Sequence, residues 1–351
     1  MNPDVLLETR GPLALVTLNR PKAHNALDLG MIRALHPALE QWAGRPEVKA
    51  VVVRGAGGRA FCAGGDVRAV AGSLDVPGEQ EPLARAFFRE EYRLNQLIHH
   101  YPKPYVALVD GICMGGGLGL SRHGSHRVVT ERLLLAMPET GIGLFPDVGG
   151  GWFLPRFPGE SGTYLGLTGN RCGAADALWL GYATWRVKHD RLDAVVDALA
   201  AADWGGGPEH AVVSRVLSDF TSEPGPSPLA AHAKEIDRCF AGNRVEEILE
   251  ALAAEGTPWA EETRATLGRM SPTSLKVTLR QLRLGRGMSY DEVAAMEYRL
   301  SQRFMSQPDF REGIRAVLVD KDQKPRWNPP TLAEVRDEDV EAFFAPLAPG
   351  E

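Results

Sequence analysis

The chain has 351 residues, of which 44% are hydrophobic and 24% are charged, and its formal net charge is −6. This is ordinary for a globular protein with one large domain and an appended region. The chain lacks the clustered positive charge of nucleic-acid binders, and its four cysteines form no CxxC pair that would indicate a disulfide framework or a metal site. It also lacks a leader pattern and an apolar run of membrane-spanning length, so we expect a cytoplasmic protein without nucleic-acid or membrane partners.

The first half of the chain alternates strand-like runs with glycine-rich loops and helical patterns. Short apolar runs rich in branched residues predict strands at residues 5–8, 13–19, 48–54 and 105–109, the first two forming a hairpin. The spacing of apolar residues predicts a helix that Asp28 caps, and a second helix over residues 81–100. This alternation is typical of α/β proteins, in which helices pack on sheets.

After residue 160 nearly every apolar stretch has helical spacing. The predicted helices cover residues 190–202, 209–220, 229–240, 245–254, 260–270, 274–284 and 290–305. Ser271 and Ser289 stand where helices 274–284 and 290–305 begin, as N-cap residues do. We therefore expect an α/β core over residues 1–203 and a helical C-terminal region over residues 204–351.

The stretch 111–151 combines two glycine clusters with two acidic side chains. The clusters lie at residues 115–119 and 149–151, and within residues 137–151 the acidic side chains are Glu139 and Asp147. Glycine lets a backbone approach a ligand closely and aim bare N–H groups at a negative oxygen. The stretch therefore predicts a site that stabilises an oxyanion, although close packing of two elements would also explain the glycines.

Three linked motifs carry a family resemblance. Residues 19–27 (NRPKAHNAL), 60–66 (AFCAGGD) and 111–117 (GICMGGG) resemble the crotonase superfamily of enoyl-CoA hydratases and isomerases. Further segments resemble its 3-hydroxyisobutyryl-CoA hydrolase branch, at residues 88–92, 137–151, 271–276, 296–301 and 309–321. The resemblance covers nearly the whole chain. It implies an α/β fold with a crotonase-like ββα-spiral core and a helical C-terminal region, acting on acyl-CoA thioesters.

The resemblance also implies roles for particular residues. It places an oxyanion hole on the backbone N–H groups of Ala63 and Gly116, and the loss of one such donor typically costs about 3 kcal/mol of barrier. It makes Glu139 the general base or the nucleophile, and Asp147 the group that orients the substrate hydroxyl or the water. Further substrate contacts are implied at Glu91, Gly64, Gly65, Asp66 and Gly115. Coenzyme A contacts are implied at Lys22, Asn25, Ala26 and Leu27, and the charge of Lys321 makes it a candidate contact for the phosphates of coenzyme A.

Simpler interpretations of these acidic residues remain open from the sequence. Asp147 could cap a helix that begins at Val148, and Glu139 could be a solvated loop charge. Glu91 follows Glu90 on a predicted helix, where glutamates are usually solvated. No cofactor is expected, because coenzyme A is part of the substrate, and no metal site is expected.

One position inside the glycine cluster favours hydrolysis over hydration. The hydratases of the superfamily carry a glutamate two residues after the glycine triplet, where this chain has Gly119. Syn hydration needs two carboxylates to hold and split one water. We therefore expect hydrolysis of a 3-hydroxyacyl-CoA thioester. The resemblance to the hydrolase branch implies that the reaction converts 3-hydroxyisobutyryl-CoA to 3-hydroxyisobutyrate and CoA in valine catabolism. An enoyl-CoA hydratase or isomerase and a non-catalytic acyl-CoA-binding subunit are the alternatives, and a homo-oligomer is left open.

Overall fold

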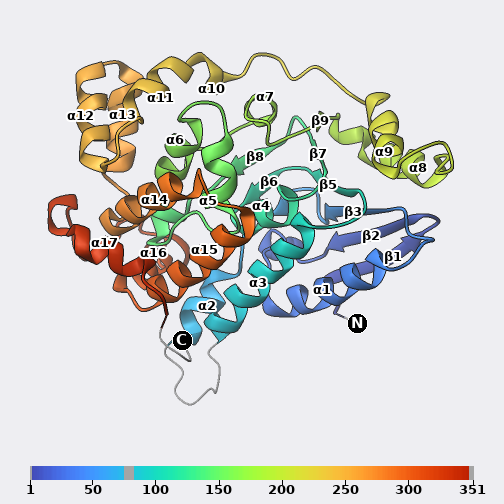
Figure 1. The fold of residues 1–351 in the computed structure, drawn as a ribbon, viewed down its shortest axis with the longest axis horizontal. Helices are drawn as coiled ribbons and strands as arrows, with labels where there is room; N and C mark the ends of the chain where they lie inside the picture. The colour runs from blue at the N-terminus through green and yellow to red at the C-terminus, as the bar shows by residue number, and fades with distance from the viewer. Residues whose placement is uncertain (1, 75–82, 348–351) are drawn as a thin grey trace. The chain divides into compact units, whose positions relative to one another are not determined.

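The computed structural model describes residues 2–74 and 83–347 (Figure 1). The chain divides into two compact units. The first unit contains the chain up to Gly65 together with Arg93–Leu135 and Cys172–Ala230. The second contains Asp66–Tyr92, Ala136–Arg171 and the chain from Ala231 onward. The expected division at residues 203 and 204 does not coincide with these units, because the chain passes between them several times rather than once.

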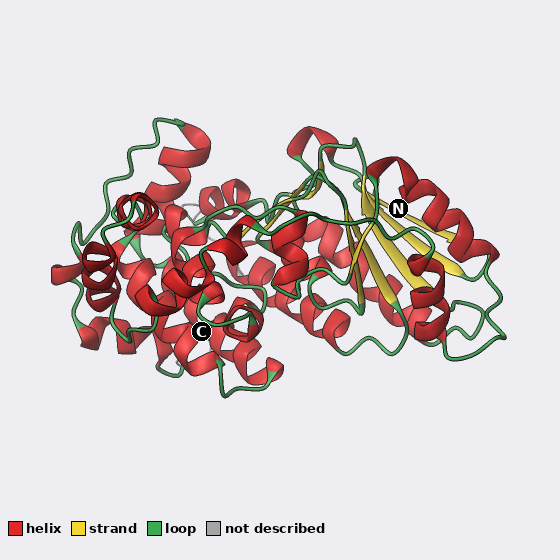
Figure 2. Cartoon of the chain, turned by 90° about the horizontal axis from the view of Figure 1, so that it is seen from above, coloured by secondary structure: helices red, strands yellow, loops and turns green. Residues whose placement is uncertain are grey.

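The first unit is built on a six-stranded sheet. Its strands, in spatial order, are β1 (Val5–Arg10), β2 (Leu13–Leu18), β3 (Ala50–Gly55), β5 (Tyr105–Val109), β7 (His126–Val129) and β9 (Trp185–Arg186). β1 and β2 pair antiparallel, which confirms the predicted hairpin, and the remaining neighbours pair parallel. Figure 2 shows these strands side by side in yellow. A smaller sheet has the order β4 (Ala60–Cys62), β6 (Ile112–Met114), β8 (Leu134–Ala136).

Continuous apolar runs explain why the inner strands of the large sheet are buried. Every residue of β2 and β5 is buried, as expected for parallel strands covered on both faces. Side chains of these strands pack in one cluster with residues of two helices, α8 (Leu192–Ala201) and α9 (Glu209–Ser218). The other α-helices that begin in this unit are α1 (Leu29–Ala43), α4 (Gly116–Ser121), α7 (Ala174–Trp179) and α10 (Pro228–Ala231). α3 (Leu83–His99) starts in the second unit and ends in the first.

The second unit is almost entirely helical. Its α-helices are α2 (Val67–Ser73), α5 (Gly150–Phe153), α6 (Ser161–Thr168), α11 (Ala233–Cys239), α12 (Val245–Glu255), α13 (Pro258–Leu267), α14 (Pro272–Gly285), α15 (Tyr290–Met305), α16 (Pro308–Ile314) and α17 (Asp337–Phe344). The side chains of Ser271 and Ser289 cap α14 and α15, as predicted. The expected helical C-terminal region is confirmed, since every element after β9 in the described chain is helical.

Short single turns complete the chain. They are η1 (Pro21–Ala23), η2 (Glu139–Ile142), η3 (Leu154–Arg156), η4 (His189–Arg191), η5 (Arg315–Val319) and η6 (Leu332–Glu334). None of the four cysteines is in a disulfide and all four are buried, in keeping with their interpretation as small apolar side chains. Among the helices of residues 2–74 and 83–347, none has the length and apolarity that a membrane crossing requires.

The cap of α1 gives a first test of the fold. Asp28 Oδ1 accepts a hydrogen bond from the Met31 N–H at 2.8 Å. Asp28→Ala should lower the free energy of unfolding by about 1 kcal/mol, whereas Asp28→Asn, which keeps the acceptor, should lose far less. Urea denaturation measures both variants.

The control for this test is Asp197→Ala, which removes a solvent-exposed ion pair with Arg10. It should leave the urea midpoint nearly unchanged. If Asp28→Asn were as destabilised as Asp28→Ala, the ion pair of Asp28 with Arg20 at 3.5 Å, rather than the cap, would account for the stability.

Candidate active site

Three of the predicted acidic residues are buried in the second unit. Glu91 lies on α3 and is 2% exposed, while Glu139, which opens η2, and Asp147, in the loop before α5, are each 5% exposed. Acidic side chains are almost never fully buried without a reason. The interpretation of Glu91 and Glu139 as solvated surface charges is therefore wrong.

Asp147 does not cap a helix with its side chain. α5 begins at Gly150, and its N-cap residue is Gly149, which has no side chain to accept a hydrogen bond. The Asp147 backbone carbonyl accepts from the Gly150 N–H at 2.7 Å, while its Oδ2 accepts from the Tyr92 hydroxyl at 2.9 Å. The carboxylate is thus held beside Tyr92, which leaves the helix-cap interpretation without support.

The surroundings make these carboxyls hold their protons more tightly than usual. Burial raises the pKa of Asp147 to about 7, although the hydrogen bond from Tyr92 opposes this shift. Burial, followed by the negative charge of Asp147, raises the pKa values of both Glu91 and Glu139 well above the usual range. No lysine or arginine of the described chain pairs with any of the three to offset this. A group such as Asp147, with a pKa near neutral pH, is suited to general acid–base catalysis.

Two carboxyl oxygens of this cluster lack a protein partner. Glu91 Oε1 and Glu139 Oε2 are buried, and neither makes a hydrogen bond within residues 2–74 and 83–347. Buried polar atoms are nearly always paired in folded proteins, so exceptions call for an explanation. A bound water or a substrate hydroxyl that hydrogen-bonds to these oxygens would explain why the protein leaves them unpaired.

In the first unit, two glycine loops lie side by side. Gly64 and Gly115 have positive φ angles of 111° and 46°, which favour glycine. A Cβ atom added to Gly64 would lie 3.8 Å from the Gly116 nitrogen, so the loops are in contact. Gly116 is the first residue of α4, and its N–H meets no acceptor in the described chain. This is the condition that the predicted role of Gly116 as an oxyanion donor requires.

The prediction for Ala63 as the other donor needs correction. The Ala63 N–H donates to the His24 carbonyl at 3.0 Å, and a backbone amide has a single proton to donate. The Gly65 N–H, two residues later, makes no hydrogen bond within the described residues. Gly65 is therefore the better donor candidate on this loop. The sequence motif limited the choice of the oxyanion donor to a few residues, but it could not show where the N–H of each residue points.

Two of the predicted coenzyme A contacts are corrected in the same way. The side chain of Asn25 is buried and donates to the Ala56 and Ala60 carbonyls at 3.0 and 2.8 Å, which fastens its loop to the next one. Leu27 is fully buried in the core. Both side chains are structural, and neither is free to contact a ligand.

The other predicted binding residues retain accessible groups. Lys22 and Lys321 are exposed, and Ala26 is partly buried. The side chain of Asp66 accepts from the Ala69 N–H at 3.3 Å as the cap of α2. Near Lys321, the guanidinium of Arg315 forms ion pairs with the carboxylates of Glu312, Asp320 and Asp322.

Sequence reasoning missed two residues next to the carboxylates. Tyr92 directly follows Glu91 in the segment 88–92, but no role in the site was predicted for it. Glu297 lies on α15, is 1% exposed and contributes to the raised pKa of Glu139. Its signal was available, because Glu297 occupies the same helical face as Val293 and Leu300, where an apolar residue is expected.

Known proteins are similar to this chain in sequence. The model of the enoyl-CoA hydratase/isomerase family matches residues 13–344. The chain is 49% identical over 347 residues to a Xenopus laevis protein named "3-hydroxyisobutyryl-CoA hydrolase, mitochondrial", with 97% of this chain and 89% of the relative covered. It is 47% identical over 349 residues to the Homo sapiens protein of the same name, with 98% and 89% covered.

Two solved structures have the same fold as this chain, but their names differ from those of the relatives above. A carnitinyl-CoA dehydratase from Mycobacterium thermoresistibile superposes with a TM-score of 0.92 at 43% identity, covering 99% of this chain and 98% of the other. An enoyl-CoA hydratase from Rhodobacter sphaeroides superposes with a TM-score of 0.87 at 40% identity, covering 98% of each chain. The expected crotonase-like fold is thereby confirmed.

The raised pKa of Asp147 predicts that this side chain lowers stability at neutral and alkaline pH. Because the pKa is about 7 in the folded protein and 3.8 ordinarily, folding favours the protonated form, and this contribution is lost as pH rises toward 7. Asp147→Asn keeps an oxygen that can accept from Tyr92 and removes the charge. Its melting temperature should exceed that of the unchanged protein at pH 8, by a margin that shrinks toward pH 4.

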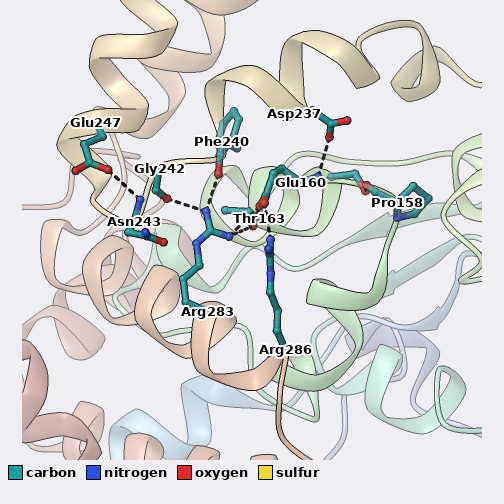
Figure 3. A network of polar contacts seen from close by, with 11 residues as sticks. Pro158, Glu160, Thr163, Asp237, Phe240, Gly242, Asn243, Glu247, Arg283 and Arg286 are labelled. Carbon is teal, nitrogen blue, oxygen red and sulfur yellow. Dashed lines mark hydrogen bonds and ion pairs between the residues drawn. The ribbon is translucent and has the colours of Figure 1, made fainter.

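Glu160, a carboxylate whose surroundings lower its pKa, serves as the control. Glu160 accepts from Arg283 at 2.9 Å and from Arg286 at 2.5 Å (Figure 3). Burial favours a raised pKa for Glu160, but these hydrogen bonds and one from Thr163 outweigh it and lower the pKa. Glu160→Gln should therefore lower the melting temperature at pH 8. A decrease for Asp147→Asn as well would show that the Asp147 charge does not cost stability.

Proposed function

Because this chain belongs to the enoyl-CoA hydratase/isomerase family, we propose that it is an enzyme that hydrolyses a 3-hydroxyacyl-CoA thioester, with 3-hydroxyisobutyryl-CoA as its substrate. The observation that carries hydrolysis over hydration is Gly119, which leaves the position of one hydratase glutamate without a side chain. The acyl group is proposed from the full-length similarity to relatives that bear the name 3-hydroxyisobutyryl-CoA hydrolase.

The proposed chemistry gives each carboxylate one task. With Glu139 as the base, its carboxylate takes a proton from water while the water oxygen attacks the thioester carbonyl carbon. The tetrahedral intermediate then releases the coenzyme A thiolate and leaves the free acid. With Glu139 as the nucleophile, its oxygen attacks the same carbon and the coenzyme A thiolate leaves, which forms an anhydride. Water then cleaves this anhydride into the free acid and the regenerated Glu139 carboxylate. Asp147 binds the substrate hydroxyl or the water in either case.

Backbone N–H groups would stabilise the charge that develops on the carbonyl oxygen. Gly116 and, in place of Ala63, Gly65 are the proposed donors, because their N–H groups are unpaired within the described chain and their loops touch. Each such donor is typically worth about 3 kcal/mol of barrier. The glycines matter sterically as well, since a side chain on them would occupy the space that the carbonyl needs.

The two solved structures, of a carnitinyl-CoA dehydratase and an enoyl-CoA hydratase, supply a second candidate function, which is hydration of an enoyl-CoA or the reverse dehydration. Both reactions use the same kind of oxyanion. Hydration needs two carboxylates that act on one water. Glu139 would have to be paired with either Asp147 or Glu91, since Gly119 has no side chain to supply a carboxylate. We keep hydrolysis as the proposal because breaking a thioester with water needs one base rather than two matched carboxylates.

The cellular setting is proposed with the reaction. Hydrolysis of 3-hydroxyisobutyryl-CoA would place the enzyme in valine catabolism. The names of the Xenopus and human relatives assign those proteins to mitochondria. They do not support the cytoplasmic location expected for this chain, which stays a proposal that fractionation of the source cells would test.

A substrate panel tests the reaction class. The purified protein should release free thiol from 3-hydroxyisobutyryl-CoA far faster than it hydrates crotonyl-CoA, because one of the two hydratase carboxylates is missing. Thiol release and the loss of enoyl absorbance measure the two reactions. Comparable rates would overturn the choice of hydrolysis, and tight acyl-CoA binding with neither reaction would indicate a non-catalytic subunit.

The role of Glu139 gives a separate prediction. Glu139→Gln preserves the shape of the side chain but removes its basicity and nucleophilicity, so kcat should fall at least about 10²-fold while acyl-CoA binding stays measurable. Steady-state thiol release and calorimetric titration of a substrate analogue give the two quantities. A variant with nearly full kcat would remove Glu139 from the mechanism.

A further inference from the structure

Glu297 is a buried carboxylate to which the proposed chemistry gives no task. It lies on α15 beside the buried side chains of Val293, Met296 and Leu300, and is 1% exposed. A carboxylate in such surroundings is strongly unfavourable unless hydrogen bonds replace its hydration. The groups that provide these bonds should therefore show what Glu297 does.

The partners of Glu297 belong to the loop that carries Asp147. Glu297 Oε2 accepts from the Gly149 N–H at 2.7 Å, and Oε1 accepts from the Gly151 N–H at 2.8 Å. The Gln281 amide on α14 donates to Glu297 Oε1 at 3.0 Å and to the Pro146 carbonyl at 2.8 Å. Two side chains from two helices thus bind the backbone on both sides of Asp147.

The bound loop has a conformation that needs such support. Val148, directly after Asp147, has a φ of 51°, and Gly149 has a φ of 88°. A positive φ is a genuine outlier for a β-branched residue and persists only where the surroundings enforce it. The strained residue lies between Asp147 and the first N–H that Glu297 holds, so relaxation of the strain would turn the Asp147 side chain.

Close packing shows that the helices and the loop are fitted to each other. A Cβ atom on Gly285 of α14 would lie 1.9 Å from the Gly151 carbonyl oxygen. A Cβ atom on Gly151 would lie 3.0 Å from Gln281 Nε2 and 3.2 Å from Glu297 Oε1. The glycines let both helices approach the loop backbone closely. The side chains of Gln281 and Glu297 therefore reach the backbone of the loop directly.

We propose that Glu297 and Gln281 are positioning residues that hold the loop of residues 146–151 and thereby orient the Asp147 carboxylate for the reaction. This inference rests on the proposed function, since it takes Asp147 to be the group that binds the substrate hydroxyl or the water. Neither side chain touches substrate in this account. Their effect on turnover passes through Asp147.

A double-mutant cycle tests this dependence. In Glu297→Gln the amide has one acceptor oxygen for two N–H groups, and its NH₂ faces one of them. We expect kcat to fall roughly 10- to 100-fold with KM changed less than about threefold, and the same substitution in Asp147→Asn protein to lower kcat by less than about threefold. Equal losses in both backgrounds would mean a general structural effect and would overturn the proposal.

Hydrogen exchange tests the same contacts without any substrate. Glu297→Gln and Gln281→Met should each speed amide exchange by roughly tenfold or more at residues 147–151, while exchange in α13 stays unchanged. Unchanged exchange at residues 147–151 would overturn the proposal. If the unchanged protein does not hydrolyse 3-hydroxyisobutyryl-CoA, the proposed function fails, and the exchange measurement still decides whether Glu297 holds the loop.

Glu160→Gln is the matched control for both measurements. It makes the same substitution in a carboxylate that also joins an α14 side chain, Arg283, to another part of the second unit (Figure 3). None of the hydrogen bonds of Glu160 in the described chain reaches residues 146–151. Its kcat should stay within about twofold. A loss in Glu160→Gln equal to that in Glu297→Gln would show that any weakened helix contact has this effect.

Discussion

The second unit depends on one constraint, which is that several carboxylates must be kept out of water without cations beside them. Glu91, Glu139, Asp147 and Glu297 are all nearly fully buried, and no lysine or arginine among the described residues pairs with them. Removing a charge from water costs several kcal/mol unless it is compensated. Here the compensation is retained protons and hydrogen bonds, and a carboxyl that holds its proton near neutral pH is useful in a reaction that moves protons.

Backbone N–H groups are the second means of compensation, and they explain where glycine is required. The Gly149 and Gly151 amides bind Glu297, and the unpaired Gly116 amide in the first unit is available to a developing oxyanion. A side chain at Gly151 would obstruct the first of these approaches, since its Cβ atom would lie 3.0 Å from Gln281 Nε2 and 3.2 Å from Glu297 Oε1. Accessible N–H groups of glycines therefore stabilise a buried carboxylate in the second unit and serve the proposed catalysis in the first.

The sequence could predict what depends on local patterns and could not predict what depends on contacts between distant segments. Apolar periodicity and capping residues located the hairpin, the caps Asp28, Ser271 and Ser289, and the helical C-terminal region. The family resemblance singled out Glu139 and Asp147, and both side chains are buried in the second unit. It could not show that the Ala63 N–H is already used by His24, or that Asn25 fastens two loops, because a hydrogen bond 35 residues away leaves no periodic trace. The units escaped prediction for the same reason, being assembled from separate stretches of chain.

Glu297 shows why a site reaches beyond the residues that touch a substrate. Asp147 follows Pro146 in a loop that is too short and too glycine-rich to fix its own shape, and Val148 adopts a φ of 51° that it would not choose alone. The shape must be imposed from elsewhere, which only rigid elements such as α14 and α15 can do. The supports must be polar, because their targets are backbone amides and a carbonyl. A buried glutamate and a buried glutamine on the apolar faces of these helices are thus the consequence of requiring a fixed carboxylate on a flexible segment.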